Sequence, residues 1–127
     1  GYNYRLPNLN AALGCAQMEK LTAMLEIKAD IADIYRSFCS KQGIELVEGI
    51  EGTRPNNWLN ALVLKSRNER DTFLKCTNNQ QVMSRPIWRL MNKLPMFKNC
   101  QTDKLENANW LEDRVVNIPS SVPEGKL

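Results

Sequence analysis

The sequence contains no histidine, so the commonest general base and the commonest zinc ligand are both missing from this chain. It also lacks a Gly-rich phosphate loop, an HExxH motif and a GxSxG motif. None of its four cysteines has the CxxC spacing of zinc or dithiol sites. Pairs of acidic residues occur only on faces expected to be solvated. The residues alone therefore indicate no metal site and no complete set of catalytic groups.

Long apolar runs and clustered charge are missing as well. No segment approaches the roughly 18 apolar residues that a membrane-spanning helix needs. The net charge is +3, from 17 basic and 14 acidic residues that are intermixed along the chain. Because nucleic-acid-binding surfaces carry clustered basic residues, neither a membrane span nor nucleic-acid binding is predicted. The cysteines are expected to be free thiols of a cytoplasmic protein, and Cys15 and Cys39 to serve as small apolar residues on a helix.

What the sequence does contain is one long helical pattern near its start. Apolar residues recur at helical spacing over residues 9–38. Pro7 fixes its own φ, Asn8 is expected to cap the helix, and Gly43 to end it. A continuous helix of this length would span about 50 Å. Since that exceeds a compact domain of 127 residues, we expect the helix either to connect two bodies or to kink.

Two features of this helix suggest close contact with another chain or domain. Gly14 lies inside the pattern at a cost of about 1 kcal/mol relative to alanine, which close approach of another backbone would explain; a plain core position is the alternative. The face carrying Leu13, Met18, Leu21 and Leu25 would form an exposed apolar patch in isolation. We therefore expect a dimer or a higher oligomer.

The remainder of the chain alternates between short strands and helices. Together with the long helix this predicts an α+β fold, a small and mostly antiparallel sheet covered by helices. The predicted division is a loop and long helix over 1–43 and a small α+β domain over 44–127. The expected strands are 44–47, 58–65, 81–85 (ending at Pro86) and 115–118. Helices are expected at 69–78 and at 103–113, the second capped by Thr102. The connections are expected to be a turn at 66–68, a helix or turn at 87–94 and a loop at 95–97.

Two segments place residues where neither core nor surface explains them. The opening segment carries Tyr2, Asn3, Tyr4 and Arg5 just before the helix. The second segment, 85–88, puts an arginine at a strand end beside a tryptophan. A guanidinium there suits phosphate or carboxylate, because its planar fork donates two parallel hydrogen bonds. A salt bridge at the sheet edge is the competing interpretation.

The sequence resembles the sugar aminotransferases of the DegT/DnrJ/EryC1/StrS family. The resemblance covers nearly the whole chain, and the sequence is most similar to the LegC-type branch of the family. The segments that carry it are GYNYRLPNLNAALGCAQMEKL, NNWLNALVL, MSRPIWRLMNKLPMF and NANWLEDRVVNIPSS.

This resemblance implies the C-terminal small domain of a fold-type I, aspartate aminotransferase-like enzyme that uses pyridoxal 5'-phosphate. The large domain and the lysine that binds the cofactor covalently would lie upstream, so the chain alone would be inactive. The intact enzyme would move an amino group, usually from glutamate, to the C4 ketone of a UDP-linked 4-keto-6-deoxy N-acetylhexosamine. Such UDP-4-amino sugars serve surface glycan or glycoprotein synthesis.

The resemblance also assigns roles to the two unusual segments. The active site would form at the interface of a homodimer, where Asn3 would bond the cofactor phosphate of the neighbouring subunit. Tyr4 and Arg5 would face the nucleotide-sugar, and Arg85 and Trp88 would form the small-domain wall of the same pocket. Two alternatives remain: a dehydratase of the same family, in which histidine replaces the upstream lysine, and a non-enzymatic dimerisation or binding module.

Overall fold

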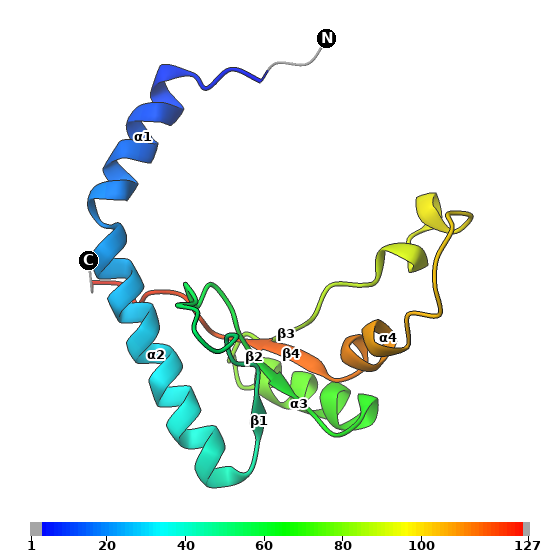
Figure 1. Ribbon diagram of the computed structural model, residues 1–127. Helices are drawn as coiled ribbons and strands as arrows, with labels where there is room; N and C mark the ends of the chain where they lie inside the picture. The colour runs from blue at the N-terminus through cyan, green and yellow to red at the C-terminus, as the bar shows by residue number, and fades with distance from the viewer. Residues whose placement is uncertain (1–3, 126–127) are drawn as a thin grey trace.

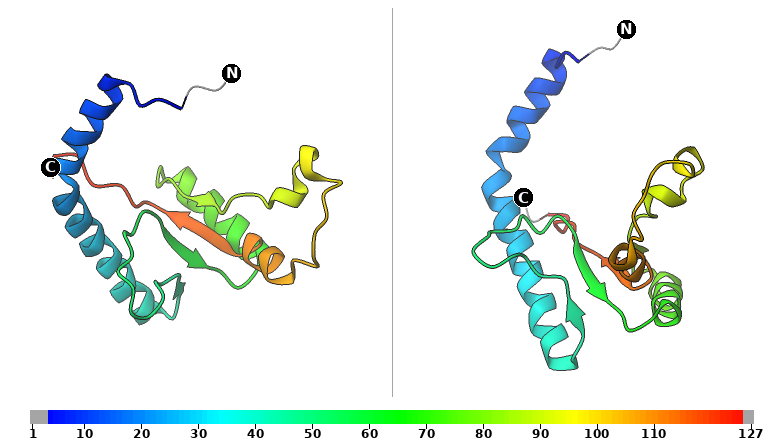
Figure 2. Two further views of the ribbon diagram at one scale, coloured as in Figure 1. Left: turned by 45° about the horizontal axis from the view of Figure 1, so that its top comes forward. Right: turned by 45° about the vertical axis from the view of Figure 1, so that its right-hand side comes forward.

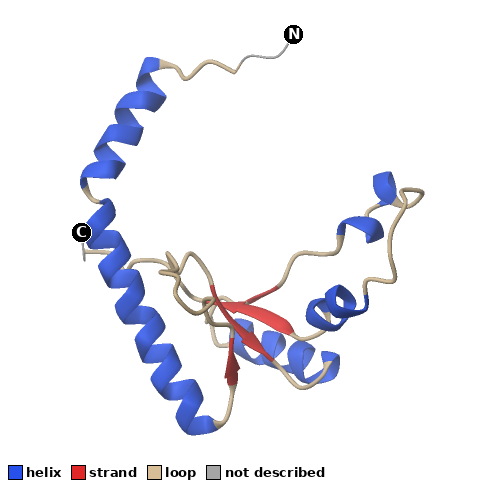
Figure 3. Ribbon diagram, viewed as in Figure 1, coloured by secondary structure: helices blue, strands red, loops and turns tan. Residues whose placement is uncertain are grey.

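The computed structural model describes residues 4–125, and in it a long bent helical arm leads into a small antiparallel sheet (Figure 1). The sheet order is β1-β2-β4-β3, and every pair of neighbours is antiparallel. Figure 3 shows the strands gathered together, with α2, α3 and α4 near them and α1 extending away. The elements are α1 (Asn8–Glu19), α2 (Leu21–Gln42), β1 (Glu45–Leu46), β2 (Asn60–Val63), α3 (Arg67–Asn79), β3 (Arg85–Pro86), the 3-10 turns Met91–Lys93 and Pro95–Phe97, α4 (Glu106–Glu112) and β4 (Val115–Ile118).

The long helix is interrupted at one residue, as the kinked alternative predicted. Lys20 has φ −98° and ψ −4°, and it separates α1 from α2. Helical hydrogen bonding resumes at once, because the Met24 amide donates to the Lys20 carbonyl at 3.0 Å. Gly43 ends α2 in the left-handed conformation with φ 64°, as predicted. Its lack of a Cβ makes that conformation inexpensive.

The predicted cap at Asn8 is wrong. Pro7 occupies the N-cap position in an extended conformation, and no side chain caps the helix. The Ala11 amide donates to the Pro7 carbonyl at 3.0 Å, so the helix begins directly after the proline. The fixed φ of Pro7 therefore sets the start of α1 one residue earlier than a side-chain cap at Asn8 would.

The predicted strands and helices of the small domain are present, with several wrong boundaries. The strand expected over 58–65 is limited to β2, because Asn57 has a positive φ of 48° and Trp58 and Leu59 remain in the loop. The turn expected at 66–68 is the start of α3: Ser66 accepts a hydrogen bond from the Glu69 amide at 3.2 Å and caps this helix. Side-chain capping at Ser66 therefore starts α3 two residues before the predicted 69.

Three expectations further along the chain are also wrong. The strand predicted over 81–85 is only Arg85–Pro86, since Gln81 has φ 61° and comes just after Gln80, the C-cap of α3. The loop expected at 95–97 is a 3-10 turn that begins with its proline. Thr102 does not cap α4, because Leu105, with φ 54°, precedes this helix and no side chain caps it. In contrast, β4 has the predicted bounds, 115–118.

The core lies where α2 and α3 meet the sheet. Val116 is fully buried, and Leu62 pairs with it across the ladder between β2 and β4. Cys39 is buried against them from α2, while all four cysteines are free thiols. Phe73 and Leu74 of α3 pack on the same cluster. The two views of Figure 2 show α1 extending away from this cluster.

Candidate functional site

A large cavity lies along the edge strand β3. Its volume is about 1080 Å³, and Arg85, Trp88 and Arg89 contribute to its wall. Arg85 pairs with Asn117 of β4, and Pro86 pairs with Val116. Pro86 has no backbone N–H to donate, so it fits only an edge strand such as β3. We call this cavity the β3 groove; its wall also includes Leu59, Ser120 and Ser121.

Two exposed tryptophans face each other beside the β3 groove. The ring centroids of Trp58 and Trp88 are 6.2 Å apart, and the ring planes are inclined by 33°. Each tryptophan is 65% exposed, although this residue type is usually well buried. Exposed aromatic rings of this kind offer flat faces to a sugar or a nucleobase.

Arg85 presents its guanidinium at the same place. Its one contact within the described part of the chain is weak, from Nη2 to the sulfur of Met83 at 3.7 Å. No ion pair with an acidic residue in 4–125 involves Arg85, which argues against the salt bridge that was its competing interpretation. An arginine without an acidic partner can bind an anionic ligand without first breaking an ion pair.

A group of polar contacts holds the segment after Trp88. Glu112 accepts hydrogen bonds from the Leu90 amide at 3.0 Å and from the ammonium of Lys93. Burial alone would raise the pKa of Glu112, but these two bonds and the charges of Lys93 and Arg89 outweigh it and lower the pKa. Arg70, itself buried, donates to the Glu112 carbonyl at 2.6 Å. Helix α4 is thereby fastened both to α3 and to the segment that carries Trp88 and Arg89.

The segment after β4 is fastened to helix α2. The hydroxyl of Tyr35 donates to the Pro119 carbonyl at 2.9 Å. Burial and the neighbouring Cys39 raise the pKa of Tyr35, so its hydroxyl stays protonated and able to donate at neutral pH. Lys28 donates to the Ser120 carbonyl at 2.7 Å. Burial also raises the pKa of the Cys39 thiol, which therefore stays neutral in the core.

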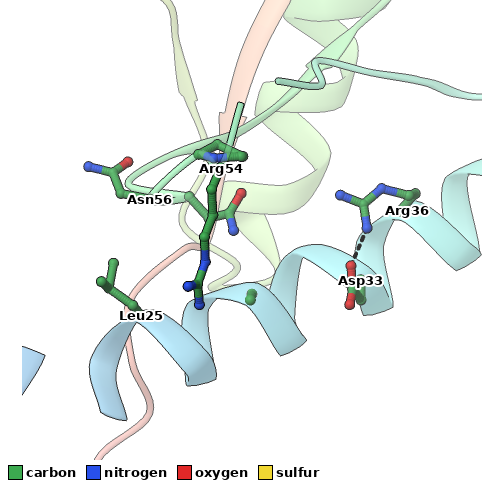
Figure 4. Close-up of a pocket in the computed structure, with 8 residues that line it drawn as sticks. Leu25, Asp33, Arg36, Arg54 and Asn56 are labelled. Carbon is green, nitrogen blue, oxygen red and sulfur yellow. Dashed lines mark hydrogen bonds and ion pairs between the residues drawn. The ribbon is translucent and has the colours of Figure 1, made fainter. Parts of the chain in front are cut away.

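A smaller cavity of about 260 Å³ lies between α2 and the loop before β2 (Figure 4). Arg54 reaches from the loop toward the helix near Leu25, while Arg36 is paired with Asp33. Arg36 also bonds Glu48 at 2.9 Å, and the hydrogen bonds to these two acids raise its pKa. Because the acids offset the arginines, this cavity offers an anion less net positive charge than the β3 groove does.

The structure places the predicted site residues in two separate regions. Arg85 and Trp88 lie together in the β3 groove. Tyr4 and Arg5 lie before α1, and Tyr4 is 92% exposed. Figures 1 and 2 show this opening segment at the far end of α1, away from the sheet. Asn3 lies outside the described residues.

Two residues of the groove region were missed by sequence reasoning. Trp58 was assigned to a strand, although an apolar ring directly after two asparagines was a possible signal of a loop position. Arg89 follows Trp88 directly and lines the same cavity, but no pattern in the sequence distinguishes it from the other exposed arginines.

Other kinds of site find no support among residues 4–125. No group of three potential metal ligands occurs there. No helix in that range has the length and apolarity to cross a membrane.

Comparisons with known proteins find several sugar-biosynthesis relatives. The chain is 33% identical over 122 residues to the GDP-perosamine synthase of Vibrio cholerae, covering 94% of this chain and 33% of that protein. Among solved structures, Helicobacter pylori PseC, an aminotransferase involved in pseudoaminic acid biosynthesis, gives a TM-score of 0.84 at 14% identity and covers 95% of this chain and 34% of its own. Spr1654 of Streptococcus pneumoniae, in its PMP form, gives a TM-score of 0.81 at 18% identity. The match covers 96% of this chain and 32% of the Spr1654 chain.

These matches establish a fold-type I relationship for a chain that spans about a third of the length of its relatives. The family model of the DegT/DnrJ/EryC1/StrS aminotransferase family matches residues 1–123, almost the whole sequence. The chain therefore belongs to the DegT/DnrJ/EryC1/StrS aminotransferase family.

Proposed function

We propose that this chain is the small C-terminal part of a pyridoxal phosphate-dependent nucleotide-sugar aminotransferase. In this proposal residues 1–43 carry the opening loop and the arm between domains, and residues 44–127 form the small domain. The large domain with the cofactor-binding lysine precedes them. Family membership supports the reaction class. The observation that carries the substrate class is the β3 groove, where Arg85 has no acidic partner in the described chain and lies beside exposed Trp88.

The groove residues suit a ligand that is both anionic and flat. Arg85 and Arg89 supply charge for a diphosphate, because guanidinium groups bind phosphate oxygens in a bidentate manner. Trp88, with Trp58 beside it, supplies a face for a base or a sugar ring. The part of this chain in the reaction is thus to bind the substrate and to orient its keto carbon.

The cofactor is assigned to the intact protein. Pyridoxal phosphate, when bound, supplies the electron sink for amine transfer. No lysine lines the β3 groove within residues 4–125. Of the residues of this chain, Asn3 is the one proposed to bond the cofactor phosphate, from the neighbouring subunit of a homodimer. Tyr4 and Arg5, which precede α1, would complete the substrate pocket of that subunit.

The proposed substrates are glutamate and a UDP-linked 4-keto-6-deoxy N-acetylhexosamine. The UDP group follows from the LegC-type resemblance, whereas the Vibrio cholerae relative is named for a GDP-linked sugar. Both nucleotides share the diphosphate that Arg85 is proposed to bind. The base is therefore the part of the substrate that the experiment must resolve.

The test is an absorption spectrum of the full-length protein before and after addition of L-glutamate, followed by supply of the keto-sugar. We expect a visible cofactor band that glutamate bleaches and that a UDP-linked 4-keto sugar restores. Restoration only by the GDP-linked analogue would transfer the proposal to a GDP-sugar. A cofactor band indifferent to amino donors would instead indicate the dehydratase branch, and no cofactor band would contradict the proposal.

A further inference from the structure

One lysine of helix α2 is bonded to two distant segments of backbone. The ammonium of Lys28 donates to the carbonyl of Ser120 at 2.7 Å and to those of Asn57 and Trp58 at 3.4 Å each. An ammonium has three N–H donors, so these bonds use its whole capacity. Asn57 and Trp58 precede β2, whereas Ser120 follows β4, more than 60 residues later. Lys28 thus connects α2 to both segments by hydrogen bonds.

The same two segments form one wall of the β3 groove. Leu59, next to Trp58, and Ser120 both line the cavity. The Asn60 amide donates to the hydroxyl of Ser120 at 2.8 Å, so the segments are also bonded to each other. Trp58 in turn faces Trp88 across 6.2 Å. The position of this wall relative to α2 therefore depends on Lys28, with support from the bond between Tyr35 and Pro119.

We propose that Lys28 is a positioning residue for the ligand of the β3 groove. This inference rests on the proposed function, because the ligand is taken to be the nucleotide-sugar. Lys28 is not part of the groove wall itself. It acts through the backbone carbonyls on which the wall is built. Since α2 continues into α1, the same hydrogen bonds set the groove relative to the opening segment with Tyr4 and Arg5 (Figure 1).

The first test is steady-state kinetics of the full-length protein carrying Lys28→Met, which keeps the stem and removes the donors. We expect KM for the nucleotide-sugar to rise about tenfold, while kcat at saturation stays within about twofold, because the change displaces binding groups and not reacting ones. Lys28→Arg keeps the charge and should leave KM close to the wild-type value. Lys41→Met, at an exposed lysine in the last turn of α2, is the matched control and should change neither constant.

The second test is amide hydrogen exchange on this chain, which requires no substrate. In Lys28→Met, the amides of Trp58 and Asn60 should exchange about tenfold faster, and those of α3 at the wild-type rate, because only the local opening is altered. Unchanged exchange at these two amides would overturn the proposal. Equal acceleration in α3 would also overturn it, since Lys28 would then serve only general stability.

The two tests separate this proposal from the proposed function. If the wild-type protein turns over no nucleotide-sugar, the proposed function fails, while the exchange measurement still decides whether Lys28 holds the wall. If the wild-type enzyme is active and Lys28→Met has an unchanged KM, the proposed function stands and the positioning role of Lys28 is wrong.

Discussion

The arm α1 and the region around the sheet both carry apolar side chains, but they bury them to different degrees. Helix α1 has no buried residue, and its Leu13 is 63% exposed. In the small domain, Leu62 is 6% exposed and Val116 is fully buried. The difference shows that the sheet, together with α2 and α3, forms a packed core of its own. The arm, in contrast, carries an apolar surface whose burial needs another body, as the expected oligomer or the proposed large domain would provide.

The largest expected effect tests this contrast directly. Leu62→Ala removes a buried side chain from the sheet and should lower the free energy of unfolding of this chain by about 2–5 kcal/mol. Leu13→Ala makes the same chemical change at an exposed position of α1 and should alter it by less than about 0.5 kcal/mol. Urea unfolding followed by circular dichroism measures both. Similar losses for both variants would show that α1 is packed in solution.

The next effect concerns the hydrogen bonds of Glu112 that hold the segment after Trp88. Glu112→Gln removes the charge that Lys93 and the Leu90 amide contact, at an expected cost of about 1–3 kcal/mol at pH 7. The folded pKa of Glu112 is lowered. Its stabilisation is therefore present above the unfolded pKa and is lost as the pH falls through the folded pKa.

The stability difference between wild type and Glu112→Gln should accordingly begin to shrink as the pH falls below the unfolded pKa of about 4.3, and it should vanish only below the lowered folded pKa. Unfolding curves collected from pH 7 to pH 3 measure this convergence. Glu124→Gln, at an exposed residue of the C-terminal segment, is the matched control. A difference that is constant over this range would mean that shape, and not charge, makes the side chain of Glu112 stabilising.

A third effect should separate binding from folding within the small domain. Arg85→Ala in the full-length protein should weaken UDP binding about tenfold, the loss of one charge-assisted contact. Its Tm should not change, since Arg85 is exposed and bonds only the sulfur of Met83 in the described chain. Calorimetric titration with UDP and with GDP measures the affinity. Arg67→Ala, an exposed arginine of α3 paired with Asp71 and Asp113, should bind as the wild type does.

The sequence predicted the elements more reliably than their ends. Hydrophobic periodicity indicated both α1 and α2, and β4 was placed at its actual bounds. Both follow from the local spacing of apolar residues. The predicted starts of the strand at Gln81 and of the last helix before Leu105 were wrong, because both residues adopt a positive φ that is not expected for glutamine or leucine. The cap at Ser66 was missed because a serine before charged residues is equally compatible with a turn.

The candidate site was only partly readable for a related reason. Arg85 and Trp88 stand in one short segment, so their combination is visible in the sequence. Trp58 is 30 positions away from Trp88, and only the ladder of β2, β4 and β3 brings the two rings together. The role of Lys28 depends on carbonyl groups at 57, 58 and 120, which no side-chain pattern encodes.

The smallest expected effect returns to the arm. Gly14 lies inside α1, and a Cβ added there would meet no atom within 4 Å in the described structure. Gly14→Ala should therefore increase the helicity of α1 and stabilise it by about 1 kcal/mol in this chain. Circular dichroism at 222 nm measures the change, and Ala12→Gly nearby should have the opposite sign.

The same substitution in the full-length protein decides what covers the arm. If another backbone approaches Gly14, as its presence in a helix suggested, the added methyl group collides with that backbone and the assembly loses stability. A gain in the isolated chain combined with a loss in the full-length protein would place the missing partner on this face of α1. A gain in both would leave Gly14 as a plain helix position, and the partner would then have to bind α1 through Leu9 and Leu13 without close backbone contact.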